Sequence, residues 1–332
     1  MAIFGILIHL HLYNIHSILN PSTNTAFRRY ILEETDMKKI LALVLALMTL
    51  CTALVGCGQS ADNNKDTYYE VSGKFLNTSL QTINPGKLTV AISPDFAPME
   101  FVDPTKTGQD MYVGFDVILA NYIADELGLE LVLMPMSFDA CQTAVYAGTV
   151  DMSISGFSWT EDRAENANLS SYYYAGDNED EQVLITLKSN EGKFDSADKL
   201  AGIKVGAQNA SLQQALVEAQ LPGSELVLFT DIGTAVLQLK SGDFDCIAVA
   251  GGNAEAIIAS NSDIALAGFN FYVDPKETGN VVLLQKGADE LTEIVNQILA
   301  QSEGYWGEWY EAAQAISGID QSFDDEGNAI TD

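Results

Sequence analysis

The sequence Ser155-Gly156-Phe157-Ser158-Trp159-Thr160-Glu161-Asp162-Arg163 joins an apolar alternation at residues 150–154 to a charged segment. The alternation predicts the end of a strand, and the charged segment predicts a helix that begins with Thr160 as N-cap. Gly156 permits unusual backbone angles or the close approach of a ligand. Arg163, about one turn into the helix, carries a planar fork of donors that matches a carboxylate. The stretch is therefore either an ordinary strand-to-helix turn with a solvated arginine or part of a carboxylate site.

The composition predicts a globular protein that does not bind nucleic acid. The chain has 332 residues, 47% of them hydrophobic and 19% charged, which is enough for two lobes with their own cores. The 46 acidic residues outnumber the 16 basic ones and give a formal net charge of −30. Such a chain repels phosphates, so the partners we expect are not nucleic acids.

An export signal begins inside the chain. Met37-Lys38-Lys39 precedes an apolar run at residues 40–50, which is typical of a secretory leader and too short to prefer spanning a bilayer. The run leads to Leu54-Val55-Gly56-Cys57, which resembles the bacterial lipobox. This resemblance implies cleavage before Cys57, lipidation of that residue and an extracytoplasmic protein anchored to the cell membrane. Residues 1–36 do not fit a leader that starts at Met37, and we interpret them as a mis-assigned N-terminal extension.

Histidine and cysteine usage limits the chemistry. All three histidines, His9, His11 and His16, precede the leader, so the mature chain has none and cannot form histidine-based triads or metal sites. Cys141 and Cys246 lie in separate apolar contexts and are expected to be buried thiols rather than a disulfide. The acidic C-terminal tail lacks the ligand spacing of a calcium loop, so we assign no metal and no cofactor.

The order of the elements predicts two α/β lobes. Residues 88–92, 129–134 and 150–154 read as strands that alternate with helices, which predicts a parallel sheet with right-handed crossovers. Asp116 is the expected N-cap of the first helix, and Gly128 stands where that helix should end. The pattern then restarts. Its expected strands are 182–187, 203–207, 225–229 and 245–249, and its expected helices are 212–220, capped by Ser211, and 232–240.

A strand at 281–284 and a helix at 289–302 are expected to return the chain to the first lobe. The predicted division of the chain is a leader at 37–56, a flexible tether at 57–86, lobe 1 at 87–179 and 273–316, lobe 2 at 180–272, and a disordered acidic tail at 317–332.

Six segments in this order resemble the family 3 bacterial extracellular solute-binding proteins. They are residues 93–101, 113–116, 135–138, 151–163, 204–211 and 241–245. The resemblance spans residues 88–310 and implies a two-lobed α/β fold of the periplasmic-binding-protein type (type II), with two hinge strands and a ligand cleft between the lobes. It also implies a monomeric receptor that delivers an amino acid or a related carboxylate to an ABC permease in the membrane.

The resemblance also implies a set of ligand-binding residues. The family positions fall on Phe96, Phe138, Gly156, Ser158, Arg163, Ser211 and Leu212. By this correspondence Phe96 and Phe138 would stack on the ligand side chain, and Gly156 and Ser158 would offer backbone groups. Arg163 would bind the α-carboxylate. Ser211 and Leu212 would bring N–H groups from a helix N-terminus in the second lobe to the same carboxylate.

The sequence departs from the family at the ammonium end of the site. The aspartate often found in the first loop is replaced by Ser93, and the aspartate that binds the α-ammonium is replaced by Ala250. An ammonium in a closed cleft needs a compensating charge or several acceptors. Asp95, Glu100 and Asn253 are the candidates for this role.

Two alternative functions use the same scaffold. One is a ligand-sensing module for a membrane signalling partner, and the other is a dehydratase-like enzyme. An enzyme would need an acid–base pair in the cleft. The sequence shows no paired carboxylates at suggestive positions, so we assign no catalytic residues and expect a binding protein.

Overall fold

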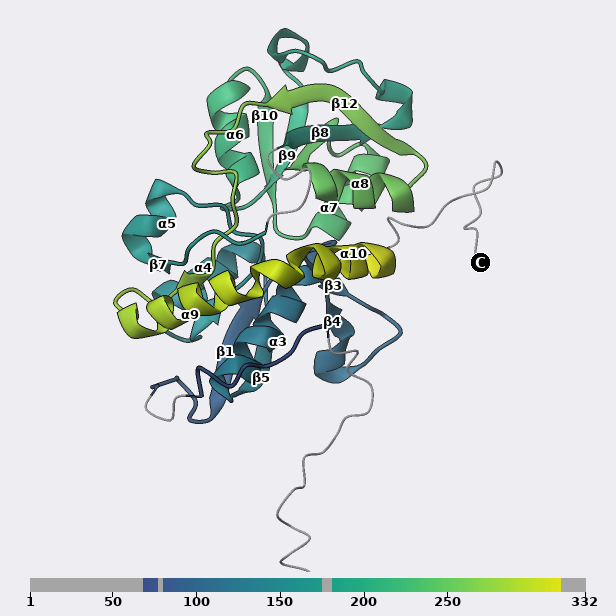
Figure 1. The fold of residues 1–332 in the computed structure, drawn as a ribbon. Coiled ribbons are helices and arrows are strands. Elements are labelled where there is room, and N and C mark those ends of the chain that lie inside the picture. Colours follow the sequence, from purple (N-terminus) through teal and green to yellow (C-terminus); the bar gives the residue numbers. More distant parts are fainter. Residues whose placement is uncertain (1–67, 77–79, 175–180, 318–332) are drawn as a thin grey trace, which may run out of the picture. The chain divides into compact units, whose positions relative to one another are not determined.

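The computed structural model describes residues 68–76, 80–174 and 181–317, which form two lobes around two five-stranded sheets (Figure 1). The leader, Cys57 and the acidic tail beyond residue 317 lie outside the described residues. Each sheet has hydrophobic clusters on both faces, so the chain builds two α/β units as the sequence predicts.

The sheet of lobe 1 has the strand order β5-β1-β6-β13-β7. Its strands are β1 (Lys87–Ile92), β5 (Glu130–Pro135), β6 (Met152–Ser153), β7 (Asn168–Leu169) and β13 (Leu283–Leu284). β1 pairs in parallel with both β5 and β6, which confirms the expected parallel core of the sheet. β13 pairs antiparallel with β6 and β7, so residues far along the chain complete this sheet.

Helices cover both faces of this sheet. They are α3 (Phe115–Leu127), α4 (Phe138–Tyr146), α5 (Glu161–Asn166), α9 (Asp289–Ser302) and α10 (Trp306–Ser317). Leu88, Val90 and Ile92 alternate along β1 and point to the cluster that α3, α9 and α10 complete, while Ala91 points to the opposite cluster with α4. Trp309 of α10 is fully buried in the larger cluster.

The start of α3 differs from the prediction. Gly114 occupies the N-cap position, with φ 119°, and Asp116 is the second residue of the helix. The Asp116 carboxylate accepts a hydrogen bond from the backbone N–H of Gly156 at 2.7 Å instead of capping its own helix. The helix ends as predicted, because Gly128 adopts the left-handed conformation at φ 67°.

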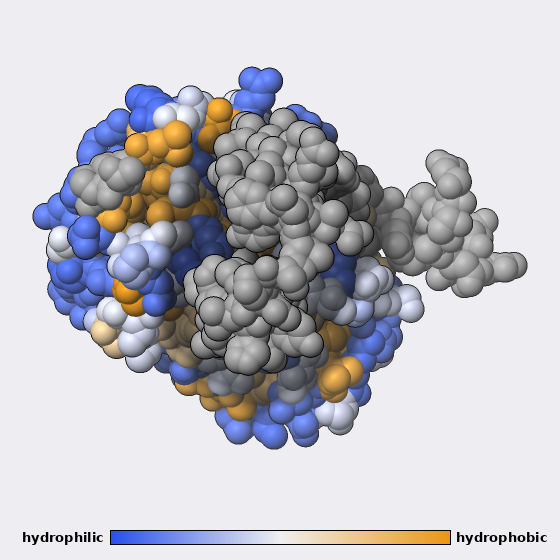
Figure 2. Space-filling view, turned by 90° about the horizontal axis from the view of Figure 1, so that it is seen from below, coloured by the Kyte–Doolittle hydropathy of each residue, from blue (hydrophilic) through white to orange (hydrophobic). Residues whose placement is uncertain are grey.

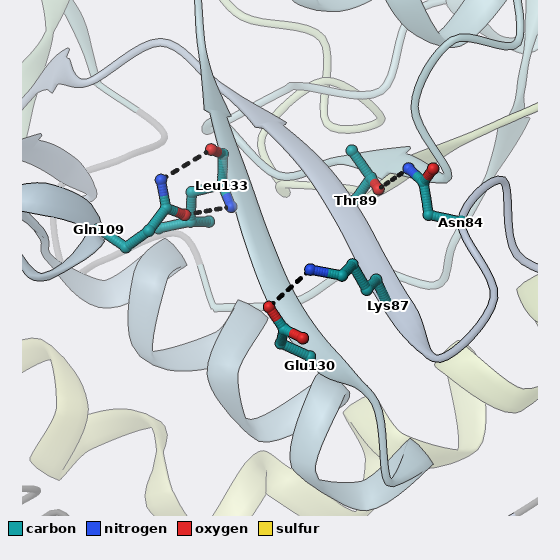
Figure 3. A network of polar contacts seen from close by, with 6 residues as sticks. All are labelled: Asn84, Lys87, Thr89, Gln109, Glu130 and Leu133. Atoms are coloured by element: carbon teal, nitrogen blue, oxygen red, sulfur yellow. Dashed lines mark hydrogen bonds and ion pairs between the residues drawn. The ribbon is translucent and has the colours of Figure 1, made fainter. Parts of the chain in front are cut away.

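Polar side chains cover the outer edge of the lobe 1 sheet (Figure 3). Gln109 binds the backbone of Leu133 on the edge strand β5, with Oε1 accepting from the N–H at 2.7 Å and Nε2 donating to the carbonyl at 3.2 Å. The amide thereby pairs edge groups that are otherwise open to another strand. Lys87 and Glu130 stand opposite each other in the parallel register and form an exposed ion pair at 2.8 Å.

A small antiparallel sheet, β2-β3-β4, sits at the start of lobe 1. It consists of β2 (Asp95–Phe96), β3 (Glu100–Val102) and β4 (Tyr112–Val113), with the 3₁₀ turn η1 (Gly108–Met111) before β4. This sheet places the predicted site residues Asp95, Phe96 and Glu100 directly after β1.

The sheet of lobe 2 has the order β10-β9-β11-β8-β12. Its strands are β8 (Gln182–Leu187), β9 (Lys204–Gln208), β10 (Glu225–Phe229), β11 (Cys246–Ala250) and β12 (Ile264–Phe271). β9 is parallel to β10 and β11, whereas β8 runs antiparallel to β11 and β12. The fifth strand of this sheet, β12, was not predicted from the sequence.

Helices of lobe 2 pack on both sheet faces. They are α6 (Leu212–Gln220), α7 (Ile232–Ser241) and α8 (Gly251–Ser260), with the 3₁₀ turns η2 (Lys188–Asn190) and η3 (Ala197–Leu200). Ser211 caps α6, as predicted, by accepting a hydrogen bond from the N–H of Gln214. Helix α8 was likewise not predicted from the sequence.

Two connections join the lobes. The first includes residues 175–180, which lie outside the described residues. In the second, residues 272–279 form no strand, and Asn280 makes isolated bridges with Ser158 and Tyr173 of lobe 1. The second connection is therefore a loop that is held to lobe 1 at its end.

Residues 68–76 pack against lobe 1, although the sequence analysis placed them in a flexible tether. The Tyr69 hydroxyl donates to Asp125 at 2.9 Å, and the backbone N–H and hydroxyl of Ser72 both donate to Glu126 at 2.7 Å. The Trp309 indole donates to the carbonyl of Tyr68. A polar composition predicted a tether, but contacts with α3 and α10 fix the segment.

The surface of the described residues carries scattered hydrophobic side chains. On the face shown in Figure 2, hydrophilic residues lie between separate hydrophobic areas. Within this part of the chain, none of the helices is both long and apolar enough to cross a membrane. Cys141 and Cys246 are free and buried, as expected from their apolar surroundings.

Candidate ligand-binding cleft

A cavity lies at the carboxyl ends of the central strands, where residues of both lobes meet. Its volume is about 30 Å³, room for one or a few water molecules. Open α/β sheets place ligands at this end of their strands. Its lining comprises Phe96, Phe138, Ser155, Gly156, Ser158, Arg163, Gln208, Leu212, Gln213, Phe229, Ile232, Ala248, Val249, Ala250 and Asn253.

Arg163 is the one ionisable side chain among these lining residues. It is 3% exposed. Its Nε donates to the amide oxygen of Gln142 at 3.2 Å, Nη1 to the carbonyl of Ser158 at 2.7 Å, and Nη2 to the carbonyl of Ala210 at 3.0 Å. Burial lowers the pKa of Arg163 to about 10, so the guanidinium stays charged at neutral pH. Within the described part of the chain, no carboxylate forms an ion pair with it.

Two aromatic rings hold the guanidinium in place. Arg163 lies 5.5 Å from the ring centre of Phe138 and 5.3 Å from that of Phe157. The two rings stack on each other with centroids 4.7 Å apart. Phe138 therefore contacts the arginine and also lines the cavity, while the fully buried Phe157 supports it from behind.

Gly156 permits the ring of Phe96 to lie against the backbone of the cavity wall. Gly156 has φ 55°, and a Cβ atom at this position would lie 2.7 Å from Cε1 of Phe96. Any larger residue would displace the ring or strain the turn. Gly156 was expected to permit close approach of a ligand, and in the structure it is the ring of Phe96, from the same lobe, that lies close to it.

The opposite wall comes from lobe 2 and includes the start of α6. Leu212 and Gln213 line the cavity, while Ser211 does not line it and instead caps the helix. The preceding residue, Ala210, adopts a left-handed conformation with φ 60°. Its carbonyl accepts from Arg163 and from Gln142 at 3.2 Å, so Ala210 joins the two lobes.

Ala250 and Asn253 form the end of the cavity near α8. Ala250 is 4% exposed and lines the cavity, so position 250 faces the cleft. Asn253 donates through Nδ2 to the carbonyl of Ala97 in lobe 1 at 3.0 Å. Its Oδ1 is buried and has no hydrogen-bond donor among the described residues. The side chain thus presents an unused acceptor where the sequence analysis placed a possible amine site.

Asp95 and Glu100, the other candidates for the amine site, do not line the cavity. The Asp95 carboxylate crosses to lobe 2, where Oδ2 accepts from the N–H of Ile232 at 2.8 Å and from Gln208 at 3.0 Å. Burial raises the pKa of Asp95 to about 6. Glu100 is fully buried behind the cavity wall and accepts a hydrogen bond from the hydroxyl of Ser155.

Part of the cavity lining was not predicted from the sequence. Gln208 and Gln213 flank the start of α6, and Phe229 and Ile232 flank the loop between β10 and α7. Gln208 and Phe229 lie at or just beyond the carboxyl end of a predicted strand, which was the available signal, and Gln213 and Ile232 lie in the first turn of the helix that follows. Gln142, which holds Arg163, gave no signal because it is one of several polar residues on a predicted helix. No group of metal-binding side chains gathers anywhere in residues 68–76, 80–174 and 181–317.

Two α/β lobes that meet over a buried cleft, joined by two connections, define the class of extracytoplasmic solute-binding proteins. The chain belongs to family 3 of the bacterial extracellular solute-binding proteins, whose family model matches residues 88–311. This match confirms the family and the fold expected from the sequence.

Individual relatives cover most of this chain. The arginine-binding extracellular protein ArtP of Bacillus subtilis is 32% identical over 272 residues, which are 80% of this chain and 93% of ArtP. The crystal structure of the amino acid ABC transporter substrate-binding protein AbpA from Streptococcus pneumoniae, bound to L-arginine, matches with a TM-score of 0.64 and 35% identity. That match covers 70% of this chain and 96% of AbpA.

One relative is an enzyme. The cyclohexadienyl dehydratase of Pseudomonas aeruginosa is 26% identical over 165 residues, 49% of this chain and 59% of the dehydratase. The identity is lower and the match shorter than for the binding protein ArtP.

Proposed function

We propose that this protein is an extracytoplasmic receptor that binds a small solute through a carboxylate, an amino acid above all, and delivers it to an ABC importer. The observation that carries the proposal is Arg163, a buried guanidinium in the wall of a cleft between two lobes. Burying a cation without an anion is costly, and a ligand carboxylate offsets that cost.

The remaining donors of Arg163 suit a carboxylate. A guanidinium has five N–H groups, and three of its hydrogen bonds go to neutral oxygens of Gln142, Ser158 and Ala210. Two N–H groups remain for a ligand, which is the number that a bidentate carboxylate contact requires. Cation–π contact with Phe138 and Phe157 fixes the plane in which these donors point.

The second lobe adds donors from the opposite side. Helix α6 begins at Leu212, and both Leu212 and Gln213 line the cavity. N–H groups in the first turn of a helix point outward and favour an anion. A carboxylate bound to Arg163 therefore meets the N-terminus of α6, so that the ligand draws the two lobes together.

The rest of the ligand would lie between aromatic and amide groups. Phe96 and Phe138 line the cavity from lobe 1 and offer faces for a ligand side chain, and the backbone of Gly156 and Ser158 lies beside them. We assign the amino end of the ligand to Asn253, whose buried Oδ1 has no other partner in the described chain. Asp95 lies nearby and supplies negative charge from beyond the lining.

Ligand entry requires the lobes to separate. The 30 Å³ cavity is too small for an amino acid. Several cross-lobe hydrogen bonds hold this closed arrangement: Asp95 to Ile232, Gln142 to Ala210, and Asn253 to Ala97. Opening about the two connections is the motion that such proteins use to admit their ligands.

The membrane attachment is a separate part of the proposal. Cys57 follows the lipobox-like Leu54-Val55-Gly56, so we propose that it becomes the lipid-bearing N-terminus of the mature receptor. Mass spectrometry of membrane-extracted protein should show a diacylglyceryl cysteine at position 57. A mature chain that keeps residues 1–36 would contradict this assignment.

The experiment that tests the binding function is a thermal-shift screen followed by calorimetry. The probes are the L-amino acids, their α-amides and their deaminated analogues. A ligand at about 100 times its Kd adds about 2.7 kcal/mol of stability, which such a screen detects. We expect stabilisation by one or more free amino acids and none by the matching α-amides. Equal stabilisation by acid and amide would contradict the carboxylate site.

The similarity to a dehydratase makes catalysis the alternative to test. An acid–base step needs a titratable group in the cavity, and Arg163 is the one ionisable residue among those that line it. Incubating the ligand identified by the screen with the protein and looking for product decides between the two functions. We expect the ligand to be recovered unchanged.

A further inference from the structure

Two acidic side chains lie together behind the wall of the cavity. Glu100 on β3 and Asp116 in the first turn of α3 are both fully buried. The Glu100 Oε1 atom accepts a hydrogen bond from the hydroxyl of Ser155, and Asp116 Oδ2 accepts one from the N–H of Gly156 at 2.7 Å. Ser155 and Gly156 are consecutive lining residues, so the two acids hold one turn of the wall.

The second oxygen of each acid has no conventional donor. Glu100 Oε2 and Asp116 Oδ1 are buried and unpaired among the described residues. The two carboxyl groups lie close enough for the charge of Asp116 to raise the pKa of Glu100. Two ionised carboxylates at this separation repel each other strongly in a low dielectric. A proton on Glu100 Oε2, donated to Asp116 Oδ1, satisfies both atoms and leaves a single negative charge.

The surrounding hydrogen bonds decide which acid is ionised. Asp116 Oδ2 accepts from both Gly156 and the hydroxyl of Tyr173, at 2.7 and 3.0 Å, and two donors favour its charged form. Burial, and then the charge of Asp116, raise the pKa of Glu100 well above its usual value. Burial also raises the pKa of Asp116, but the hydrogen bond from Gly156 opposes this shift.

The other titratable groups around the pair do not supply a counter-charge. Asp95 on β2 adds negative charge that further favours protonated Glu100, and Tyr173 acts as a neutral donor. Cys141 on α4 is a buried thiol whose pKa is raised, so it remains neutral. No lysine or arginine of the described chain forms an ion pair with either acid.

We propose that Glu100 and Asp116 share one proton, and that this proton-sharing pair positions Ser155 and Gly156 in the wall of the cavity. Its consequence for ligand binding rests on the proposed function, because these two residues line the proposed site. Asp116 also accepts from the hydroxyl of Tyr173, so it ties the cavity wall to this part of lobe 1. Both acids are positioning residues, since neither lines the cavity.

Infrared spectroscopy on the full chain without ligand tests the shared proton directly. At about pH 8, where Asp95 is ionised, we expect the carbonyl band of one protonated carboxylic acid from the pair. The band should vanish in Glu100→Gln. It should also vanish in Asp116→Asn, because the new amide donates to Glu100 and replaces the proton. Persistence of the band in Asp116→Asn, or its absence from the parent, would overturn the proposal, whatever the ligand screen finds.

The backbone amide of Gly156 reports the positioning role. Its NMR shift should change with pH in the parent as the pair loses its proton, and this change should be absent from Glu100→Gln. The amide introduced by Glu100→Gln keeps a donor toward Asp116 at every pH, so the N–H of Gly156 should stay protected from hydrogen exchange. The same pH response in parent and variant would show that Gly156 does not sense the pair.

A double variant adds a stability test. In Glu100→Gln/Asp116→Asn the amide oxygens must accept the hydrogen bonds from Ser155 and Gly156. The two NH₂ groups then face each other. The loss of Tm should therefore exceed the sum of the two single losses. Asp151 provides the control, because it accepts from the N–H of Thr89, a donor that it does not share with Glu100. The losses of Tm in Glu100→Gln/Asp151→Asn should therefore be additive. Additive losses in the Glu100/Asp116 double variant would contradict the shared proton.

Discussion

The Asp95 carboxylate of lobe 1 accepts a hydrogen bond from the backbone N–H of Ile232 in lobe 2 at 2.8 Å. Ile232 is the first residue of α7, so the carboxylate meets the N-terminus of a ten-residue helix. Helix N-termini favour negative charge, which makes this a charge-assisted contact across the cleft. The same oxygen accepts from Gln208, so one side chain of lobe 1 holds two elements of lobe 2.

We predict that Asp95→Ala shifts the ligand-free protein toward the open form. The change removes two cross-lobe hydrogen bonds to a charged group, each with a net worth of about 1.5–3 kcal/mol after exchange with water is counted. Small-angle scattering without ligand should show a larger radius of gyration. Asp103→Ala removes a carboxylate of the same lobe that bonds to Thr105 within its own loop, and it should leave the radius unchanged.

Replacing Arg163 should abolish tight binding of a carboxylated ligand. Arg163→Ala is expected to weaken binding by about 3–5 kcal/mol, because the ligand carboxylate stays buried and loses its charged partner. Arg163→Lys should recover little, since an ammonium cannot reproduce the planar fork. Calorimetry measures both variants. Lys286→Ala, which removes a lysine from lobe 1 outside the cavity lining, is the control and should bind like the parent.

Ala250→Asp should restore a carboxylate at the amino end of the ligand. Position 250 lines the cavity and faces the same space as Asn253. We expect at least a tenfold gain in affinity for a free amino acid, about 1.4 kcal/mol, and weaker binding of its deaminated analogue. Ala250→Asn has nearly the same shape without the charge and serves as the matched control. A gain of equal size in both variants would attribute the effect to shape rather than to the ammonium.

Stability should fall as the pH rises through the neutral range. The folded protein holds a proton on the Glu100–Asp116 pair, whereas unfolded carboxyl groups with pKa values of about 4 have lost theirs. The folded state therefore binds more protons than the unfolded state. The stability that these protons contribute is fully present below about pH 4 and is lost as the pH rises through the raised pKa values of the folded protein. Asp95, with a pKa raised to about 6, acts in the same direction at lower pH.

Chemical denaturation at a series of pH values measures this effect. In Glu100→Gln the contribution of one titrating acid is gone, so the decline in the free energy of unfolding from weakly acidic to alkaline pH should be shallower than in the parent. A parallel decline in the two proteins would assign the pH dependence to other groups.

Ser72→Ala should destabilise lobe 1 although Ser72 lies before the first strand. Its hydroxyl donates to Oε2 of the buried Glu126, so its loss leaves that oxygen without a donor among the described residues. The expected cost is about 1–3 kcal/mol of unfolding free energy, measured by denaturation. Ser241→Ala removes an exposed hydroxyl that bonds within its own helix, and its effect should stay within about 0.5 kcal/mol.

Local patterns made several elements predictable. Helix α6 has a serine cap and an apolar period, and α9 has a matching apolar face, so both appear in the structure with the predicted bounds. The contacts of Asp116 were not predictable in this way. A carboxylate at a helix start is typical of a cap, but the N–H of Gly156, 40 residues away, is the donor that it meets.

The sequence predicts residues of the site that lie in recognisable segments, but not the contacts between residues that are far apart in the chain. Arg163 was a candidate from its own segment, whereas Phe96 and Phe138 were implied by the family resemblance, and all three line the cavity. The partner of Asp95 is 137 residues away in the other lobe, and such a distance leaves no local trace in a sequence. Glu100 was interpreted as a possible ligand residue, but its side chain lies behind Ser155. The spacing of residues in the sequence does not reveal this direction.

Lobe 1 is assembled from two distant parts of the chain, and this sets an order for its folding during synthesis. The strands of lobe 2 lie in one continuous stretch, residues 182–271, so they can pair before the C-terminal residues have been made. The core of lobe 1 cannot be completed before Trp309 has been made, because this residue is fully buried there. Its ring centre lies 6.0 Å from that of Phe115 and 5.5 Å from that of Tyr122. A nascent chain that ends before Trp309 therefore carries a lobe 2 able to fold beside a first lobe whose apolar face is still open to chaperones and proteases.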